Sequence, residues 1–588
     1  MGDYLIVSRA VHDDQAASRR ARQIIDLARD RGMATTPLNA TTVIATAGAH
    51  PPQVQRIGGW VLLGDVLDRR NPVIPDGESD TDWGYERKMV SRLWGRFIGV
   101  RFASRDRLDA LLRDPSGAMD CVAWTQDGLT FAASAPPDWL IEALRPTWSI
   151  NIGRVAAALR SPQLVPGDLL LDGPRSVGPG DVQPLPLDRP AVRLWEAATF
   201  ARVSLDAPLT FEPAARRLRD AIQEAVEGLG GLSGVLAAEV SGGLDSSIVA
   251  AALVAAPGLK VQTWLNAYGA TPESDERFWV EALAQRLNIT PLRIAHASAP
   301  LSGETLVRTN GGFRPGLAAL DAAHDLEWRR QIEAVEADAL MTGKGGDSVL
   351  MQNTGGDVFT DLWMRCGWRT LLSREGRDQA IAVEKSLWTL AREARRFVRE
   401  GAAPPTRDDS FLLHLEDTPA MAAWRRNSAA FGPAKAGQIS GVIDNITRHG
   451  PSLLTEGVDV RHPLCAQPVV EACLSTPTAL LVLQGRDRGL ARHAFRDRLP
   501  PEILHRRSKG DMSRLYGKII LDNIDVLRDW LIHGRLVALG VIDPAGVDKL
   551  LQRETLIWRG RYAALLTAAA FEGWIRAWER RLAPPPPR

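Results

Sequence analysis

The sequence predicts an α/β protein with a β-rich N-terminal part and a C-terminal part that combines a parallel sheet with a helical end. Three observations predict this class. Up to about residue 150, short apolar segments alternate with polar ones, which is typical of strands. Between about residues 214 and 341, apolar runs alternate with amphipathic segments, which indicates parallel strands joined by crossover helices. Beyond about residue 360 the apolar spacing is mostly helical.

In the N-terminal part, strands are expected at Trp60–Leu63 and Phe97–Phe102. Asp127-Gly128 separates the apolar runs Val122–Thr125 and Leu129–Ala133. An Asp-Gly pair between two such runs is a strong signal for a two-residue hairpin turn. We therefore expect a β-rich sandwich in this part of the chain.

The stretch Ser161–Pro190 is rich in Pro and Gly, and we expect a linker or a wrapped loop between the two parts there. We expect one domain over residues 1–204 and a second over 205–588. In the second domain the expected elements alternate between helix and strand: helix Ala214–Leu229, strand Gly234–Val240, helix Ile248–Ala256, strand Val261–Ala267, helix Asp275–Leu287 and strand Ala337–Met341.

Composition excludes several classes of protein. The 588 residues include 71 basic and 70 acidic side chains, a balance that argues against a general nucleic-acid binder. Four cysteines are too few for a disulfide scaffold and indicate a reducing compartment. The N-terminus lacks the apolar core of a signal peptide, and no apolar stretch reaches about 18 residues, the length that spans a membrane. We expect a cytoplasmic protein without membrane or nucleic-acid partners.

The strongest functional signal is the loop Ser241–Ser247, with the sequence SGGLDSS, between an apolar strand and a helix. Two adjacent glycines let successive N–H groups turn toward one point, and the helix N-terminus adds partial positive charge. The spacing differs from a Walker A loop, and the loop contains Asp245. A carboxylate beside phosphate requires a bridging cation, so Asp245 implies Mg²⁺. The alternative is an ordinary glycine turn capped by Asp and Ser.

A second glycine-rich turn, Thr342–Asp347, follows the strand at Ala337–Met341. Asp347 comes after this turn as Asp245 does in the first loop. Ligands bind at the carboxyl ends of strands in open α/β sheets, so the two carboxylates could share one Mg²⁺–pyrophosphate unit there. We therefore predict a metal site at Asp245 and Asp347. Taken alone, this second motif could be a flexible turn.

These residues resemble a known family. SGGLDSS is similar to the PP-loop of ATP pyrophosphatases, in a context that resembles the asparagine synthetase family. Further elements of the resemblance, which spans about residues 205–520, are Glu273–Glu276, the G-x-G-x-D pattern of 343–347, Arg488–Arg492, Leu499–Ile503 and Arg506–Gly510. It implies that ATP is bound by Val240, Ser241, Gly242, Gly243, Leu244, Asp245, Ser246, Ser247, Gly343, Gly345 and Gly346.

The resemblance also implies catalytic roles for Asp245, Asp347, Lys344 and Lys509. It puts the family's catalytic lysine at position 509. A fixed cation there would stabilise the negative charge that grows on phosphorus and on the leaving pyrophosphate. Without the resemblance, Lys509 would be a solvated residue in a basic run.

The N-terminal part resembles the glutaminase half of the same family at Gly64-Asp65, Leu93–Phe97 and Arg113–Gly117. That glutaminase uses an N-terminal Cys as its nucleophile, whereas this chain has Gly2, and its nearest cysteine is Cys121. Without a thiolate there is no thioester and no ammonia from glutamine. We therefore expect a degenerate glutaminase-like scaffold, and an attacking amine that comes from elsewhere.

Loss of the glutaminase with retention of the pyrophosphatase points to intramolecular amide formation. β-Lactam synthetases have Tyr at the position of Lys344 and asparagine synthetases have Glu, so the chain looks most like a lasso peptide cyclase. This resemblance implies that ATP activates an Asp or Glu side chain of a linear precursor peptide, which the peptide's N-terminal amine then attacks. It also implies a leader-peptide-binding protein and a leader peptidase as partners.

Other interpretations remain open. The chain could be a β-lactam-synthetase-like or ammonia-dependent amide ligase. It could be a non-catalytic nucleotide-binding regulator, although the set of Asp245, Asp347 and Lys509 argues against this. A PP-loop tRNA-modifying enzyme is disfavoured by the neutral charge. His462, Cys465 and Cys473 match no zinc spacing, and we expect them to serve core packing.

Overall fold

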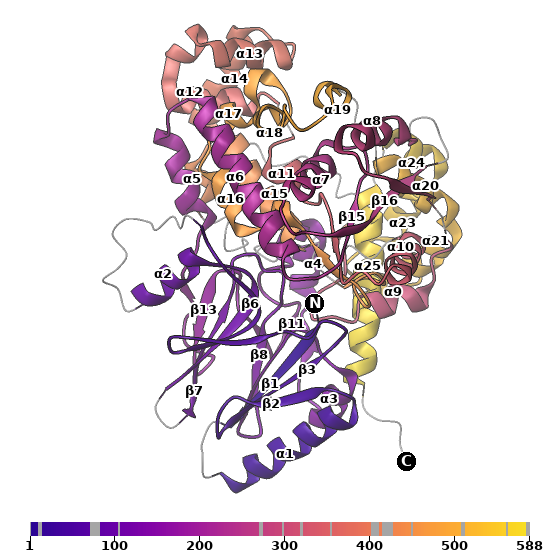
Figure 1. The fold of residues 1–588 in the computed structure, drawn as a ribbon. Coiled ribbons are helices and arrows are strands. Elements are labelled where there is room, and N and C mark those ends of the chain that lie inside the picture. Colours follow the sequence, from indigo (N-terminus) through magenta and orange to yellow (C-terminus); the bar gives the residue numbers. More distant parts are fainter. Residues whose placement is uncertain are drawn as a thin grey trace.

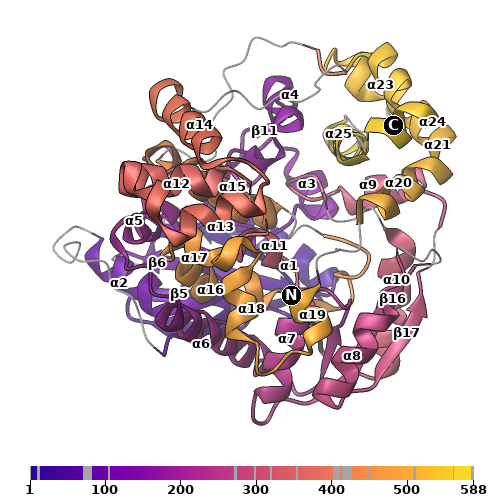
Figure 2. The ribbon, with the colours of Figure 1, turned by 90° about the horizontal axis from the view of Figure 1, so that it is seen from above.

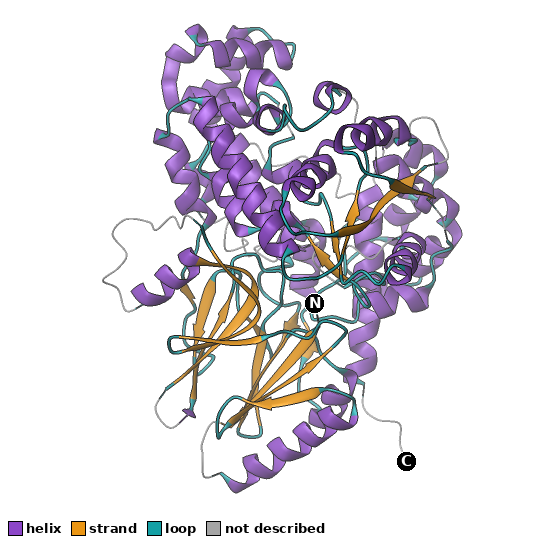
Figure 3. Cartoon of the chain, viewed as in Figure 1, coloured by secondary structure: helices purple, strands orange, loops and turns teal. Residues whose placement is uncertain are grey.

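The computed structural model (Figure 1) places a β-rich N-terminal part below a larger helical part that contains a third main sheet. It describes residues 2–9, 14–70, 83–103, 106–269, 274–296, 299–317, 321–352, 355–401, 411–413, 427–447, 451–506, 512–559 and 562–583. The strands cluster in the lower part of the molecule, and helices surround the parallel sheet above them (Figure 3). The mixed α/β class predicted from the sequence is therefore confirmed at this level.

Two six-stranded sheets form the N-terminal part. In spatial order, the first contains β12 (Arg175–Ser176), β8 (Val122–Gln126), β9 (Leu129–Ala133), β1 (Asp3–Arg9), β3 (Thr42–Ala47) and β2 (Ala34–Pro37). The second contains β14 (Val192–Arg193), β13 (Asp181–Pro184), β7 (Leu108–Arg113), β6 (Leu93–Phe102), β5 (Trp60–Asp68) and β4 (Val54–Ile57). Buried apolar side chains from both sheets meet in one cluster, among them Ile6, Ile44, Leu63, Ile98 and Leu111. Alternate residues of each strand thus form the core of a sandwich.

The predicted hairpin is confirmed. β8 and β9 pair antiparallel, and the residues between them, Asp127 and Gly128, both have positive φ, at 52° and 73°. Such a turn matches the twist of the strands it joins. The remaining helices and short strands of this part are α1 (Gln15–Asp30), α2 (Gly84–Arg92), α3 (Asp138–Leu144), β10 (Ser149–Ile150), α4 (Ile152–Arg160), β11 (Leu171–Asp172) and α5 (Ala197–Asp206).

The expectation of a linker at Ser161–Pro190 is wrong. This stretch contains β11, β12 and β13, and the last two pair with β8 and β7 of the two sheets. Most of its apolar residues are buried despite the many prolines and glycines, as Val177 and Val182 show. Strands this short carry too little alternation to be read from sequence, and their pairing partners define them.

The third main sheet is parallel and has five strands, in the order β17 (Pro291–Ala295), β16 (Val261–Tyr268), β15 (Leu236–Glu239), β18 (Ala339–Met341) and β19 (Asp459–Arg461). β15, β16 and β18 lie where the sequence predicts strands. β17 and β19 were not predicted: β17 begins with Pro and is mostly exposed, and β19 is a three-residue strand within a helical region.

Helices connect and cover this sheet. They are α6 (Phe211–Gly230), α7 (Leu244–Ala255), α8 (Arg277–Leu287), α9 (Gly303–Thr309) and α10 (Ala322–Ala334). On one face of β15, Leu236 and Ala238 join a large core with residues of α6 and α7. On the opposite face, Ala237 packs with Trp328 and Ile332 of α10 and with Leu340 of β18.

The described part of the chain beyond β18 is mostly helical, as predicted, and includes the short strand β19. Its helices are α11 (Gly346–Val349), α12 (Asp357–Cys366), α13 (Arg374–Ala382), α14 (Leu387–Glu400), α15 (Pro433–Thr447), α16 (Gln467–Leu474), α17 (Thr478–Leu481), α18 (Gly489–Ala494), α19 (Pro501–His505), α20 (Met512–Asp522), α21 (Ile524–Ile532), α22 (Arg535–Ala538), α23 (Pro544–Leu550), α24 (Arg553–Arg559) and α25 (Tyr562–Leu582). Seen from above, α12–α18 and α20–α25 form two separate groups (Figure 2). None of the helices in the described part of the chain is long and apolar enough to cross a membrane.

A buried ion-pair network joins the N-terminal sheets to the parallel sheet. Arg96 of β6 donates two hydrogen bonds to the two carboxylate oxygens of Asp459 in β19, at 2.8 and 2.9 Å, and a third to Asp65 of β5 at 2.8 Å. Arg461 donates to Asp459 as well, at 2.8 Å. Bidentate pairs of this kind fix the relative orientation of the groups that make them. The network therefore holds the edge strand β19 against the N-terminal part.

Candidate functional site

The first glycine loop lies at the carboxyl end of β15, the central strand of the parallel sheet. Val240 is buried, and α7 begins at Leu244, so Asp245, Ser246 and Ser247 occupy its first turn. Gly242 has φ of 73°, and a Cβ there would stand 3.1 Å from the Cβ of Trp279. The helix predicted at Ile248–Ala256 starts four residues after the observed start of α7. The first turn of α7 consists mainly of the polar residues of the loop, so it lacks the apolar pattern of a helix.

Hydroxyl groups close this loop on itself. Ser246 Oγ accepts a hydrogen bond from the Ser241 nitrogen at 3.1 Å and lies 2.9 Å from Ser241 Oγ. Ser247 Oγ donates to the carbonyl of Gly243 at 2.7 Å. The loop thus holds the tight turn that the sequence predicts, with its backbone beside the N-terminus of α7.

The second glycine loop follows β18, the neighbour of β15, and touches the first. Gly345 has φ of 90°, and α11 starts at Gly346. A Cβ at Gly343 would stand 2.4 Å from the Ser246 nitrogen, and a Cβ at Gly346 would stand 2.4 Å from Asp245 Cγ. Both positions therefore require glycine for the loops to approach this closely.

Arg488 brings the two predicted metal ligands together. Its Nη1 donates to Asp245 Oδ2 at 2.8 Å and to Asp347 Oδ1 at 2.7 Å, while Nη2 donates to Asp487 at 2.9 Å. Burial opposes the charge of Arg488, but the three carboxylates outweigh burial and raise its pKa. The sequence placed Arg488 only in a resemblance block and did not predict this contact.

The donor set fits a divalent cation. Two carboxylates from adjacent strand ends already lie within reach of one positive nitrogen atom, and oxygen ligands are those that Mg²⁺ prefers. No cluster of three or more His, Cys, Asp or Glu side chains suited to a metal occurs in the described ranges. Phosphate oxygens would therefore have to complete the coordination of Mg²⁺ at Asp245 and Asp347.

Arg506, just beyond α19, lies against the first loop. It donates to the Gly242 carbonyl at 3.0 Å and to Glu276 at 2.5 Å, and its guanidinium lies 3.8 Å from the ring centroid of Trp279. Lys509, the predicted catalytic lysine, lies outside the described residues, as does Glu273.

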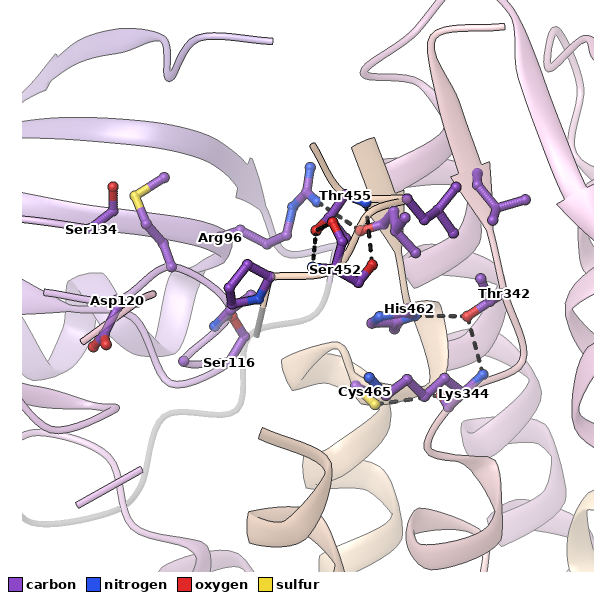
Figure 4. A pocket seen from close by; sticks show the side chains of 18 of the residues that line it. Arg96, Ser116, Asp120, Ser134, Thr342, Lys344, Ser452, Thr455, His462 and Cys465 are labelled. Atoms are coloured by element: carbon purple, nitrogen blue, oxygen red, sulfur yellow. Dashed lines mark hydrogen bonds between the residues drawn. The ribbon is translucent and has the colours of Figure 1, made fainter. Parts of the chain in front are cut away.

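A cavity of about 510 Å³ lies between the N-terminal sheets and the parallel sheet. In Figure 4, Ser116, Asp120 and Ser134 lie on its N-terminal side, and Thr342, Lys344, His462 and Cys465 lie on the opposite side. Thr342 Oγ1 lies 2.7 Å from His462 Nδ1 and accepts a hydrogen bond from the Lys344 backbone nitrogen at 3.3 Å. Lys344 thus belongs to the cavity wall as well as to the second glycine loop.

Glu239 also lines this cavity, and sequence reasoning missed it. Burial, together with repulsion from Glu276, raises the pKa of Glu239 to about 7. The signal in the sequence is an acidic residue inside the otherwise apolar strand GVLAAEV. Perturbed carboxyl groups in cavities are candidates for proton transfer.

Of the other two cysteines named in the sequence analysis, Cys473 is buried and Cys465 is half-buried at the cavity wall. Cys473 lies in α16, and burial raises its pKa, like that of Cys465, to about 12. Cys465 donates a hydrogen bond from its sulfur to the Lys344 carbonyl at 3.4 Å. These contacts are those of packed side chains.

The N-terminal end of the cavity contains Gly2. The Gly2 nitrogen donates to the His50 carbonyl at 2.6 Å, and a Cβ at Gly2 would stand 2.0 Å from the Ala47 carbonyl oxygen. A side chain at position 2 would therefore require the backbone to shift. Cys121 is buried in the sandwich, and burial raises its pKa to about 12. It is not a thiolate at neutral pH.

The chain matches a protein-family model. The family model described as asparagine synthase matches residues 217–576, which is more than half of the chain. The matched segment includes both glycine loops, Arg488 and Arg506, and it begins after the two N-terminal sheets. No curated protein matches the chain.

Proposed function

Because this chain belongs to the asparagine synthase family of ATP-dependent, AMP-forming amide ligases, we propose that it is a macrolactam cyclase. It would use ATP to join an Asp or Glu side chain of a linear precursor peptide to the N-terminal amine of the same peptide. The product would be a lasso peptide precursor ring, with AMP and pyrophosphate released.

The observation that carries this proposal is the cavity between the two parts. A volume of about 510 Å³ is in the range that accommodates a drug-sized ligand, far larger than ammonia requires. The cavity reaches from Lys344 at the second glycine loop to Gly2, where a glutaminase of this family would carry its nucleophilic cysteine. A cavity of this size, in contact with the second glycine loop, is large enough to hold several residues of a peptide.

In the proposed reaction, backbone N–H groups of Ser241–Gly243 and the first turn of α7 bind the phosphates of ATP. Asp245 and Asp347 would hold Mg²⁺, which would neutralise phosphate charge. The peptide carboxylate attacks the α-phosphorus, pyrophosphate leaves, and an acyl-adenylate forms. The peptide amine then attacks the acyl carbon and AMP leaves. Lys509 and Lys344 would stabilise negative charge at the phosphates and the carboxylate.

Folding of the peptide inside the cavity would bring amine and adenylate together. Holding two reactants in productive geometry can lower a barrier by about 7–11 kcal/mol. We propose that the domain at 1–204 is a degenerate glutaminase-like scaffold that supplies one wall of this space, and that 205–588 is the ligase domain. A leader-peptide-binding protein and a leader peptidase would act in the same cytoplasmic pathway.

The test is pyrophosphate release and product mass with linear peptides. The peptides are taken from short reading frames beside the gene and carry an N-terminal Gly and an acidic residue about seven to nine positions later. A product lighter by one water supports the cyclase. Gain of nitrogen from added ammonia would indicate an ammonia-dependent ligase, and a product only from a small amino acid would indicate β-lactam formation.

Asp245→Asn is expected to abolish pyrophosphate release, with Asp525→Asn as the matched control because Asp525 has 99% of its side chain exposed. Nucleotide binding without any turnover in the unmodified protein would favour a regulator instead.

A further inference from the structure

Glu239 is the only acidic residue of β15 and ends the strand two residues before Ser241. Successive side chains of a strand point to opposite faces. The neighbours that share a face and pack beneath α6 and α7 are Leu236, Ala238 and Val240. Glu239 therefore projects from the face of Ala237, toward the cavity that it lines.

The Glu239 carboxylate has no hydrogen bond or ion pair within the ranges that the structure describes, whereas Glu276 is paired with Arg506 at 2.5 Å. A carboxylate placed beside apolar residues without a cation destabilises the fold. The position of Glu239 is therefore explained by a function in the cavity, where its carboxylate binds a ligand or takes up a proton, and not by a contribution to stability.

Burial and the neighbouring Glu276 set the proton affinity of Glu239, and other titratable groups line the same cavity. Glu276 lies on the side of α8, Lys344 and His462 on the side of β18 and β19, and His324 and Asp325 on α10. Burial lowers the pKa of His324 to about 4 and raises that of Asp325 to about 6. With its own pKa raised to about 7, Glu239 is the strongest base of these three near neutral pH.

The reaction needs a base because a peptide α-amine, with an ordinary pKa of about 8, is mostly an ammonium ion at neutral pH. A lysine ammonium group donates hydrogen bonds and accepts none, so Lys344 of the second glycine loop does not supply this base. His462 engages Thr342 through Nδ1. The Asp325 carboxylate is hydrogen-bonded to the Ser452 side chain and to the backbone of Leu453 and Leu454. Glu239 is both adjacent to the first glycine loop and open to the cavity.

We propose that Glu239 is the catalytic base of amide formation, an inference that rests on the proposed function. The Glu239 carboxylate binds the ammonium group of the peptide and accepts its proton. The proton moves from nitrogen to a Glu239 carboxylate oxygen. The free electron pair of the amine forms the C–N bond, the bond from the acyl carbon to the adenylate oxygen breaks, and that oxygen leaves with AMP. The second proton lost by nitrogen passes to solvent.

The experiment compares Glu239→Gln with the unmodified enzyme in two reactions of the same linear peptide. In the first, the peptide cyclises through its own amine. In the second, hydroxylamine, which is largely uncharged at neutral pH, traps the adenylate as a hydroxamate without a base. Glu239→Gln is expected to slow cyclisation by about 100-fold or more and to leave hydroxamate formation and pyrophosphate release nearly unchanged.

Three controls separate a base from a structural residue. Glu239→Asp keeps a carboxylate and is expected to recover part of the cyclisation rate. Glu142→Gln changes an exposed glutamate of α3 and is expected to behave as the unmodified enzyme. The cyclisation rate of the unmodified enzyme should rise as pH passes through about 7. In Glu239→Gln this rise should move to about pH 8, where the peptide amine itself loses its proton.

A substrate-free measurement completes the test. The infrared band of a protonated carboxyl group that Glu239→Gln removes should titrate near pH 7 in the unmodified protein. Equal loss of hydroxamate and cyclic product in Glu239→Gln, or a band that titrates at the ordinary pH for glutamate, would overturn the assignment. Absence of both products in the unmodified enzyme would instead count against the proposed function.

Discussion

Gly343 approaches Ser246 so closely that a Cβ on Gly343 would stand 2.4 Å from the Ser246 backbone nitrogen. This nitrogen lies in the first turn of α7, where backbone N–H groups have no partner within the helix and can bind an anion. The approach therefore couples the end of β18 directly to the phosphate-binding turn after β15.

Gly343→Ala should push these loops apart, because the clash is with backbone and cannot be relieved by rotating a side chain. We expect peptide-dependent pyrophosphate release to fall by at least tenfold, with a lowered affinity for ATP measured by calorimetry. Gly437→Ala is the control, since Gly437 lies in α15 with nothing within 4 Å of the added Cβ. Unchanged ATP affinity in Gly343→Ala would show that the loops can separate without consequence.

Arg488→Gln removes the positive charge between Asp245 and Asp347. Breaking a largely buried pair costs about 3 kcal/mol, and the repelling carboxylates should make the variant depend more strongly on a divalent cation. We expect a lower melting temperature in EDTA and a larger rise on adding Mg²⁺ than in the unmodified protein. Arg496→Gln, at an exposed pair with Glu212, should change stability by less than about 1 kcal/mol. An Mg²⁺ response equal to that of the unmodified protein would contradict a cation site at these carboxylates.

The Asp459 carboxylate should make stability depend on pH. Burial raises its pKa, but Arg96 and Arg461 outweigh burial and hold the pKa well below its usual 3.8. The folded state thus favours the ionised form, so the stabilisation is present above about pH 4 and is lost as pH falls below it. Asp459→Asn should destabilise the protein by about 3 kcal/mol at pH 7, and by less at pH 3.5, in urea unfolding.

Asp68→Asn is the matched control for this pH dependence. Asp68 pairs with Arg92 on the surface, with 61% of its side chain exposed, and its loss should matter little at either pH. A destabilisation by Asp459→Asn that is the same at both pH values would show that its charge is not the cause.

Thiol labelling should distinguish the four cysteines. Burial raises the pKa of Cys121, Cys465 and Cys473 to about 12. Cys366, at the end of α12, is half-buried, as is Cys465. Only the thiolate reacts with iodoacetamide, so at pH 8 the native protein should take up label at Cys366 alone, located by peptide mass. Rapid labelling of Cys121 would show that the sandwich opens readily.

Local patterns were enough to predict the two glycine loops. Gly242, Gly343 and Gly346 are required by close backbone approaches within a few residues of the strand ends, and glycine at such spacing is readable in sequence. The hairpin at Asp127-Gly128 was predictable for the same reason. Each motif is recognisable from residues that are neighbours along the chain, although the contacts that require Gly343 and Gly346 join the two loops across about a hundred residues.

Arg488 and Glu239 could not be predicted in the same way. Arg488 reaches Asp245 across 243 positions of sequence, and Glu239 acquires its environment from Glu276 and from a cavity formed by both parts of the chain. β19 is likewise defined by pairing with β18, which precedes it by more than a hundred residues. Such contacts depend on how distant segments pack.

Helix α25 packs against α9, α3 and α4, and its Trp574 and Trp578 belong to the same apolar core as Leu5 and Val7 of β1. In Figure 1 this helix reaches down beside the N-terminal sheets. During synthesis, more than three hundred residues must therefore follow the last strand of the first sheet, β12, before α25 can cover its part of the sheet's outer surface. Nascent chains of this protein should be chaperone clients until the last turns emerge.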